Sequence, residues 1–391
     1  MDDSAANILV ISFSPLHRDP RVRRQILLLR DQGYRVTALG FSDPDIEHVK
    51  YWRIDPTRKS LSQKIVSALL LKGGLFGTYY SRVSAVRQIK RTRSQHEDAR
   101  WDLVLANDID ALPIALELAN NCPVFFDAHE FSPGEWATWQ FNFLFSRYKR
   151  WLCRRYLDRP DAMSTVCEGI AEAYADEFGV DVPVVILNAP NYQQIVAGGV
   201  DKTRVRLVHH GAALADRRLE VMIDMLALLD DRFTLDFFLM TDFRGGIAYR
   251  DQLKERANAS GLADRVVFRD PVPTEKIPST INQYDIGVNP LEPRCLNEEL
   301  ALPNQFFEFV QARLAIAIGP STEMARLVRK HDLGVVAEDF SAQSMANAIS
   351  ALSPEDILRY TQNSDVAAKE LSFDAQAPLF LATVRRLLNN D

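Results

Sequence analysis

Short apolar runs rich in β-branched residues alternate with amphipathic helical stretches along most of this chain, and this alternation constrains its fold more than any other feature. Ile8–Phe13 is apolar at nearly every position, which predicts a strand buried on both faces. In the stretch from Pro20 to Gly33, Val22, Ile26 and Leu29 follow spacings of four and three, which predicts a helix that stops at Gly33. Strands that alternate with helices favour a parallel sheet with right-handed crossovers and helices on both faces.

The alternation occurs twice, with a break near residue 190. The further strands that we expect are 35–41, 103–106, 124–127, 162–166 and 184–187 before the break, and 205–209, 235–240, 265–268, 286–289, 315–318 and 334–336 after it. Turn chemistry at Asn188-Ala-Pro-Asn marks the break. The chain therefore predicts an α/β protein of two Rossmann-like doubly wound domains facing across a cleft. We expect an N-terminal domain at 1–195, a C-terminal domain at 196–375 and a last helix at 376–391, which is a candidate to pack back on the N-terminal domain.

Composition excludes several classes of protein. The chain has 391 residues, 47% of them hydrophobic, and a net charge of -6, which is typical of a globular protein and disfavours disorder and nucleic-acid binding. No apolar run reaches the ~18 residues of a membrane-spanning helix, and the acidic start is unlike a signal peptide. The four cysteines lie far apart without CxxC spacing, which indicates free thiols and no metal site. We expect a cytoplasmic protein without metal or cofactor.

Ligands of open parallel sheets collect outside the carboxyl ends of the strands, so the residues after each strand are candidates for a site. The candidates are Asp19, Arg21, Asp108, His129 and Glu130 in the first half, and Gly211, Arg217 and Arg269 in the second. The first strand is not followed by G-x-G-x-x-G, and the chain contains neither a phosphate-binding glycine loop of the Walker type nor G-x-S-x-G. Ordinary dinucleotide binding and serine-hydrolase chemistry are therefore disfavoured.

Five segments together resemble a known family. They are Asp19-Pro-Arg21-Val22, Phe126-Asp-Ala-His-Glu130, Ser164-Thr-Val-Cys-Glu-Gly169, Leu187-Asn-Ala-Pro190 and Leu302-Pro-Asn-Gln-Phe-Phe-Glu-Phe309. In this order they resemble the opening, the DxHE segment, the segment that precedes the linker, the interdomain Asn-x-Pro and the LPNKxFEY nucleotide-binding segment of family 4 glycosyltransferases of the GT-B fold.

The resemblance implies a retaining transfer of a sugar from a nucleoside diphosphate sugar to a polysaccharide, lipid-linked or small-molecule acceptor. The nucleotide would bind the second domain and the acceptor the first. Arg217 would contact the diphosphate beside Gly211, and Glu308 would bind the ribose hydroxyls. Leu302, Pro303 and Asn304 would lie beside the nucleotide. His129 would face the transferred sugar, and the leaving phosphate itself would help to deprotonate the acceptor.

Simpler readings of these residues stay open at this point. His129 could be a capping or core histidine, and Asp19 could form a local ion pair with Arg21. Asp108 could cap the following helix. Arg217 could belong to the solvated start of a helix at 219–228, although cations are disfavoured there. Leu300 stands eight residues before Glu308, where the family has another glutamate. A nucleotide-sugar epimerase or hydrolase on the same scaffold, or a non-catalytic binding protein, therefore remains an alternative.

A basic stretch in the first half suggests a further partner. Residues 50–100 hold 12 basic and 3 acidic side chains, and basic residues between 82 and 93 alternate with Val83, Val86 and Ile89 at helical spacing. The segment from Arg147 to Arg155 is similar. Basic amphipathic helices with aromatic residues suit an anionic membrane surface, whereas the simpler reading is a solvated helix face. We expect peripheral attachment to the inner face of the plasma membrane and an acceptor of the cell envelope.

Overall fold

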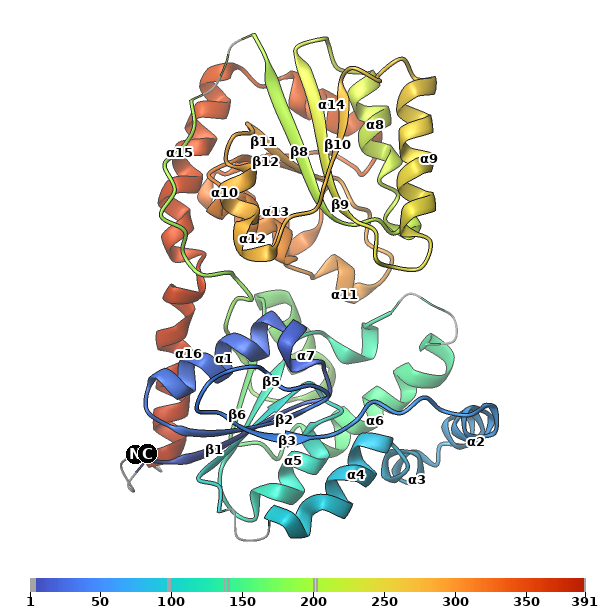
Figure 1. The fold of residues 1–391 in the computed structure, drawn as a ribbon, viewed down its shortest axis with the longest axis vertical. Helices are drawn as coiled ribbons and strands as arrows, with labels where there is room; N and C mark the ends of the chain where they lie inside the picture. The colour runs from blue at the N-terminus through green and yellow to red at the C-terminus, as the bar shows by residue number, and fades with distance from the viewer. Residues whose placement is uncertain are drawn as a thin grey trace. The chain divides into compact units, whose positions relative to one another are not determined.

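The computed structural model describes residues 5–96, 100–136, 138, 141–199, 201 and 203–389. The chain forms two compact units (Figure 1). The first unit, called the first domain below, comprises residues 1–186, 295–298 and 377–391. The second unit, called the second domain, comprises residues 187–294 and 299–376.

The first domain contains a wholly parallel sheet whose strands run in the order β3-β2-β1-β4-β5-β6-β7. The strands are β1 (Asn7–Ser12), β2 (Arg35–Gly40), β3 (Lys50–Arg53), β4 (Leu103–Asn107), β5 (Val124–Ala128), β6 (Ala162–Thr165) and β7 (Val184–Val185). The helices are α1 (Pro20–Asp31), α2 (Leu61–Lys72), α3 (Phe76–Ser81), α4 (Ser84–Thr92), α5 (Leu112–Ala119), α6 (Ser146–Tyr156) and α7 (Glu168–Phe178). The last helix of the chain, α16 (Phe373–Asn389), has most of its length in this domain.

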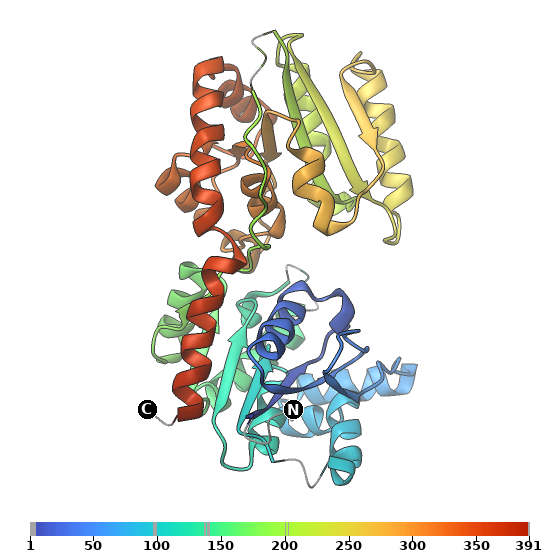
Figure 2. The same cartoon turned by 60° about the vertical axis from the view of Figure 1, so that its left-hand side comes forward.

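One face of the first sheet packs on helices from both ends of the chain. Ile8 and Val10 of β1 share a buried core with Val22 of α1 and with Phe380 and Val384 of α16. Figures 1 and 2 show α16 running beside this sheet, with α1 on the same side. The central strands are apolar except for Asn7 at the start of β1 and one polar residue at or next to the carboxyl end of each strand, because both faces of the sheet are covered by helices.

The second domain also has a wholly parallel sheet, in the order β10-β9-β8-β11-β12-β13. Its strands are β8 (Val205–Ala212), β9 (Phe233–Met240), β10 (Val266–Arg269), β11 (Ile286–Asn289), β12 (Ala315–Ile318) and β13 (Gly334–Val336). The helices along this part of the chain are α8 (Glu220–Ala227), α9 (Gly246–Ala259), α10 (Ile277–Ile281), α11 (Leu296–Glu299), α12 (Asn304–Gln311), α13 (Thr322–His331), α14 (Ala342–Ser350) and α15 (Pro354–Glu370).

The two faces of this second sheet can be told apart at β11. Ile286 and Val288 point into the core that α8, α9 and α14 cover. Between them, Gly287 faces α12: a Cβ added at Gly287 would lie 2.4 Å from the ring of Phe309. The absence of a side chain at Gly287 thus lets α12 approach β11 closely, which sets the position of the helix that carries Glu308.

Strand order reverses beside β1 in the first sheet and beside β8 in the second, so both sheets have a topological switch point. Loops on either side of such a point run in opposite directions and leave a crevice at the carboxyl ends of the strands. The expected fold class, two doubly wound Rossmann-like domains, is confirmed.

Several elements differ from the expectations. The edge strand β3 and the helix α2 were not predicted, β8 continues to Ala212 instead of ending at His209, and α1 ends at Asp31. Within the described residues, no helix has the length and the apolar character that crossing a membrane requires.

Candidate functional site

The first cluster of polar side chains lies at the switch point of the first sheet. Ser12, Asn107, Asp127 and Ser164 are paired in register across β1, β4, β5 and β6, so that they form one row at the carboxyl ends of these strands. All four are buried. A polar row inside an apolar sheet is costly unless its members are hydrogen-bonded.

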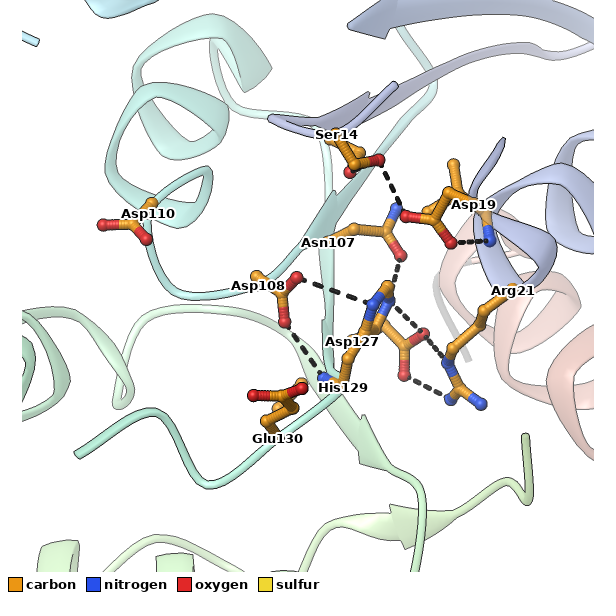
Figure 3. Close-up of polar contacts among 12 residues, drawn as sticks. Ser14, Asp19, Arg21, Asn107, Asp108, Asp110, Asp127, His129 and Glu130 are labelled. Atoms are coloured by element: carbon orange, nitrogen blue, oxygen red, sulfur yellow. Dashed lines mark hydrogen bonds and ion pairs between the residues drawn. The ribbon is translucent and has the colours of Figure 1, made fainter. Parts of the chain in front are cut away.

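Asp127 is the centre of this row (Figure 3). Arg21 donates to both of its carboxylate oxygens, from Nε at 2.6 Å and from Nη2 at 2.7 Å. Gln25 Nε2 donates at 2.5 Å and Ser164 Oγ at 2.7 Å. Burial alone would raise the pKa of Asp127, but the guanidinium of Arg21 and the nearby His129 outweigh it and hold the pKa well below its ordinary value. Asp127 is therefore a buried anion throughout the physiological range.

His129 lies above this anion. Its Nε2 is 2.9 Å from Oδ1 of Asn107 and 3.5 Å from Oδ2 of Asp127, and its Nδ1 is 3.5 Å from Oδ2 of Asp108. Burial would lower the pKa of His129, but Asp108 and Asp127 outweigh it and raise the pKa to about 9. The imidazole is thus protonated at neutral pH. A cation in this place offers charge and N–H groups to a ligand, and it is not poised to accept a proton.

Two of the simpler interpretations of this region are wrong. Asp19 does not pair with Arg21: it caps α1 by accepting from the backbone of Val22 at 3.2 Å, and it accepts from Ser14 Oγ at 2.7 Å. Arg21 points instead at Asp127, 106 residues away, because the first turn of α1 lies over the end of β5. Asp108 does not cap α5; its carboxylate accepts from the backbone of His129 at 3.2 Å. Both acids therefore shape the polar cluster.

Glu130 follows His129 in the loop after β5 and is solvent-exposed. Partial desolvation, together with the charges of Glu135 and Asp108, raises the pKa of Glu130, and water in contact with the exposed carboxyl keeps this shift small.

The second cluster lies at the carboxyl end of β8. Gly211 has a φ of 144°, a conformation that side chains disfavour, and a Cβ added there would lie 3.4 Å from Nη1 of Arg217. Arg217 ends a 3-10 turn at Ala215–Arg217 and so lies outside α8, contrary to the expectation that it begins a helix. The pKa of His209 is lowered to about 4, mainly by burial and in part by the charge of Arg217. The guanidinium thus lies beside the backbone of β8 at Gly211.

Glu308 is buried in α12 and faces the same strand. Its Oε2 is 3.4 Å from Nε2 of His210, which burial keeps neutral by lowering its pKa to about 3. Gln305, one turn earlier on α12, donates to the carbonyl of His210 and accepts from Asn289 Nδ2 at 2.8 Å. These contacts fix α12 against β8 and β11, so Glu308 and Arg217 both lie along β8.

The remaining predicted residues divide into two groups. Leu302 and Pro303 lead directly into α12, with Pro303 at its N-cap position and Asn304 as its first residue. Arg269 lies apart from them at the end of β10, two strands from β8, where its Nε donates to Asp236 at 2.7 Å. This pairing gives Arg269 a structural partner, and the structure does not bring it to Gly211 or Glu308.

Sequence reasoning missed several partners. Asn107 was seen only as a loop residue, Gln25 was not singled out, and Ser164 was named only as part of the segment from Ser164 to Gly169. A signal for Gln25 was present: it follows Arg21 by four residues, so both side chains lie on the buried side of α1. In the second domain His209 and Gln305 were also missed. Among the described residues, no group of three or more His, Cys, Asp or Glu side chains could hold a metal ion.

Two family descriptions match this chain. "Glycosyl transferase 4-like domain" matches residues 19–190, and "Glycosyl transferases group 1" matches residues 204–354. The first match contains the cluster around Asp127 and His129, and the second contains Gly211, Arg217 and Glu308. A search of curated proteins found no match.

Solved structures share the whole fold at low sequence identity. Sucrose-phosphate synthase from Thermosynechococcus elongatus has a TM-score of 0.73 and 15% identity, over 99% of this chain and all of that one. HepE from Anabaena in complex with UDP-glucose has a TM-score of 0.67 and 17% identity, over 96% and 99% of the two chains. A glycosyltransferase from Rickettsia africae has a TM-score of 0.68 and 13% identity, over 99% and 100%. At these identities the likeness shows the fold.

Proposed function

The chain belongs to the GT-B glycosyltransferases that join a glycosyltransferase 4-like domain to a group 1 domain, and on that premise we propose that it moves a sugar, with retention of configuration, from a nucleoside diphosphate sugar to a carbohydrate or lipid-linked acceptor. Sugar transfer from a nucleotide sugar follows from the family. The stereochemistry, the acceptor and the roles of single residues are our proposals. Measuring the anomeric configuration of the product by proton NMR tests the first of these.

The observation that supports the donor site best is the placement of Arg217 over Gly211 with Glu308 buried on the facing helix. A diphosphate needs cations and backbone N–H groups that are not already covered by side chains, and the bare backbone at Gly211 gives it that approach. A carboxylate accepts hydrogen bonds only, so Glu308 suits the two hydroxyls of a ribose. Leu302, Pro303 and Asn304 would pass beside the nucleotide at the start of α12.

Calorimetry with UDP, GDP, dTDP and ADP tests this site. We expect one nucleotide to bind, and we expect Glu308→Ala and Arg217→Ala each to weaken its binding about tenfold or more, because each removes a charge-assisted hydrogen bond. Glu255→Ala on the exposed side of α9 and Arg250→Ala, which loses a surface pair with Asp251, are matched controls. Unchanged affinity in Glu308→Ala would remove the assignment.

In the first domain, we propose that the His129 imidazolium contacts the transferred sugar and that Asp19, Arg21, Asp108 and Glu130 shape the acceptor side. Asp108 and Asp127 together supply the charge that keeps His129 protonated, and Arg21 pairs with Asp127. Replacing His129 with alanine should slow transfer while leaving nucleotide affinity unchanged. Hydrolysis of the nucleotide sugar without any acceptor would instead favour a hydrolase on this scaffold.

We also propose that the first domain docks on an anionic membrane, at the cytoplasmic face, where a lipid-linked or cell-envelope acceptor would be made. The support lies in α2. Leu61, Ile65 and Leu69 follow at spacings of four, so they share one side of the helix, and they are 74%, 53% and 64% exposed. No acidic residue occurs between Asp55 and Glu97, whereas this stretch contains nine Lys and Arg residues. Apolar and cationic groups together suit the headgroup region of an anionic bilayer. If the purified protein did not bind phosphatidylglycerol vesicles at low salt, this proposal would fail.

A further inference from the structure

The first domain contains a pocket of about 400 Å³ to which the proposed function assigns no role. Its volume falls in the range of small-molecule sites, about 300–1,000 Å³. Phe13 and Phe41 reach it from the loops after β1 and β2, Asp110 from the loop after β4, and Trp136 from the segment after β5. Helices α3 and α6 and the start of α4 form most of the remaining wall. The pocket thus opens at the same edge of the sheet as the cluster around His129.

Aromatic rings make up much of the wall, and they are packed in place. Tyr79 of α3 meets Tyr148 of α6 edge to face, with ring centroids 4.9 Å apart, and Phe145 lies beyond Tyr79 at 6.4 Å. Trp136 is the exception, because it is 57% exposed at the rim. A rigid wall of this kind loses little entropy when a flat apolar surface stacks on it.

The polar groups of the pocket are few and fixed. Lys149 is buried on α6, with its Nζ 2.5 Å from Oδ2 of Asp110 and 3.4 Å from Oε2 of Glu135. Glu135 Oε1 accepts from Trp136 Nε1 at 2.8 Å. Oδ1 of Asp110 has no hydrogen-bond partner among the described residues. These groups offer acceptors at one edge of an aromatic pocket.

One buried polar atom has no partner. The hydroxyl of Tyr148 is buried and makes no hydrogen bond within the described chain. Burial and the charge of Asp110 raise the pKa of Tyr148, so this hydroxyl stays protonated and can donate. Buried hydroxyls in native proteins are nearly always satisfied, so an orphan on the wall of a pocket indicates a ligand group that completes it.

Charge narrows the choice of ligand. Two carboxylates and one ammonium leave a formal charge of -1 in the pocket, which repels phosphates and carboxylates. An aliphatic chain would fill the volume but would leave the Tyr148 hydroxyl and Asp110 Oδ1 without partners. A neutral sugar ring matches both features, because it has C–H groups on its faces and hydroxyls at its edge.

We infer that this pocket holds an uncharged sugar ring of the acceptor, stacked on the aromatic wall and hydrogen-bonded to Asp110 and Tyr148. The inference rests on the proposed function, because it calls the ligand an acceptor. The chain supports such a role by proximity: Asp110 is two residues from Asp108, whose carboxylate contacts His129, and Glu135 is close enough to raise the pKa of Glu130.

The test measures binding to the full chain without any nucleotide sugar. Neutral methyl hexopyranosides, the corresponding hexose 6-phosphates and 1-octanol are titrated separately, with saturation-transfer NMR and tryptophan fluorescence as readouts. We expect a neutral hexoside to bind saturably and its 6-phosphate to bind at least tenfold more weakly. Tighter binding of the phosphate would overturn the inference. So would binding of octanol with no binding of any hexoside, which would indicate an apolar ligand.

Variants locate the binding. Tyr148→Phe removes only the orphan hydroxyl and should weaken hexoside binding about three- to tenfold, the value of one hydrogen bond. Trp136→Ala changes an exposed ring and should weaken binding without unfolding the protein. Phe143→Ala, an exposed aromatic outside the pocket lining, is the control. Equal affinity in all three variants would contradict the inference.

The outcomes separate this inference from the proposed function. Nucleotide affinity is measured independently in the same variants and should not change, since the pocket and the donor cluster belong to different domains. If hexosides fail to bind while transfer to some acceptor proceeds, only the pocket assignment falls. If hexosides bind but no nucleotide does, the sugar pocket stands and the donor assignment falls.

Discussion

At the scale of single residues, the polar cluster of the first domain balances its charges almost completely. Arg21 and His129 are cations, Asp127 and Asp108 are anions, and each contacts at least one opposite charge. Such a set is stable only while it is complete, because removing one member leaves a buried charge without a partner. The cluster therefore ties the fold of this domain to its proposed chemistry.

Replacing Arg21 with methionine tests this dependence. The change keeps much of the side-chain volume but leaves Asp127 as an unpaired buried anion, so we expect a loss of about 3–5 kcal/mol in unfolding free energy. Urea denaturation followed by fluorescence measures it. Arg30→Met on the same helix loses a surface pair with Asp31 and a long hydrogen bond to the carbonyl of Glu47, and it should cost less than about 1 kcal/mol. Similar losses of unfolding free energy in the two variants would show that the buried pair of Arg21 and Asp127 stabilises the protein no more than a surface pair does.

The raised pKa of His129 gives stability a definite dependence on pH. The folded pKa of about 9 lies above the unfolded value of about 6.5. The stabilisation is therefore complete below about pH 6.5 and is lost as pH rises through 9. The difference amounts to roughly 3 kcal/mol by linkage.

Melting temperatures recorded between pH 6 and 9.5 check this expectation. The unmodified protein should lose stability over this range, and His129→Gln should lose markedly less. Parallel curves for the two proteins would mean that His129 is not protonated in the native state.

Some of this cluster could be predicted from the sequence, and the rest could not. Arg21 and His129 stood out because each comes after a predicted strand, whereas Asp127 lay within the strand predicted at 124–127 and was named only in the segment from Phe126 to Glu130. The pairing of Arg21 with Asp127 could not be read, because local reasoning sees only neighbours within a turn and offered Asp19 instead. The row of Ser12, Asn107, Asp127 and Ser164 depends on the register between strands, which a single sequence does not specify.

At the scale of elements, most strands were found because buried parallel strands are continuous apolar runs. β3 was missed because its four residues, Lys50 to Arg53, have a cation at each end, as an edge strand permits. α2 was missed for the opposite reason. Its apolar residues face outward and only Leu71 is buried, so the helix lacks the pattern of one apolar side turned to a core.

The exposed side of α2 carries its own prediction. A Leu61→Ser/Leu69→Ser double variant should bind vesicles of phosphatidylglycerol and phosphatidylcholine about tenfold or more weakly, because each leucine inserted into a bilayer contributes about 1.5–3 kcal/mol. Its melting temperature should stay the same, since both side chains already face solvent. Val366→Ser on α15, where the side chain is 79% exposed, is the control and should bind vesicles normally. Co-sedimentation with vesicles measures the difference.

At the scale of the whole molecule, the two domains do not divide the chain into two simple halves. The core of the first domain includes Phe380, Leu381, Val384 and Leu387 of α16, although the entire second sheet precedes them in the sequence. Phe380 packs against Phe125 of β5, with ring centroids 5.5 Å apart. The last helix is therefore a structural part of the first domain.

Truncating a side chain of this helix should weaken that domain. Phe380→Ala removes a ring that is 2% exposed, and we expect it to cost about 3–5 kcal/mol. Leu379→Ala changes the neighbouring side chain, which is 47% exposed, and should cost far less. Calorimetric unfolding of the full chain compares them. An equal effect of the two substitutions would mean that α16 contributes little to the core.

This placement of α16 has a consequence for how the protein is made. Domains usually fold on the ribosome in the order in which they emerge. Here residues 377–389 emerge after the second domain is complete. Until then, the face of the first sheet that packs on α16 stays partly uncovered. The N-terminal half should accordingly depend on chaperones during synthesis, and it should reach its native state later than the half that follows it.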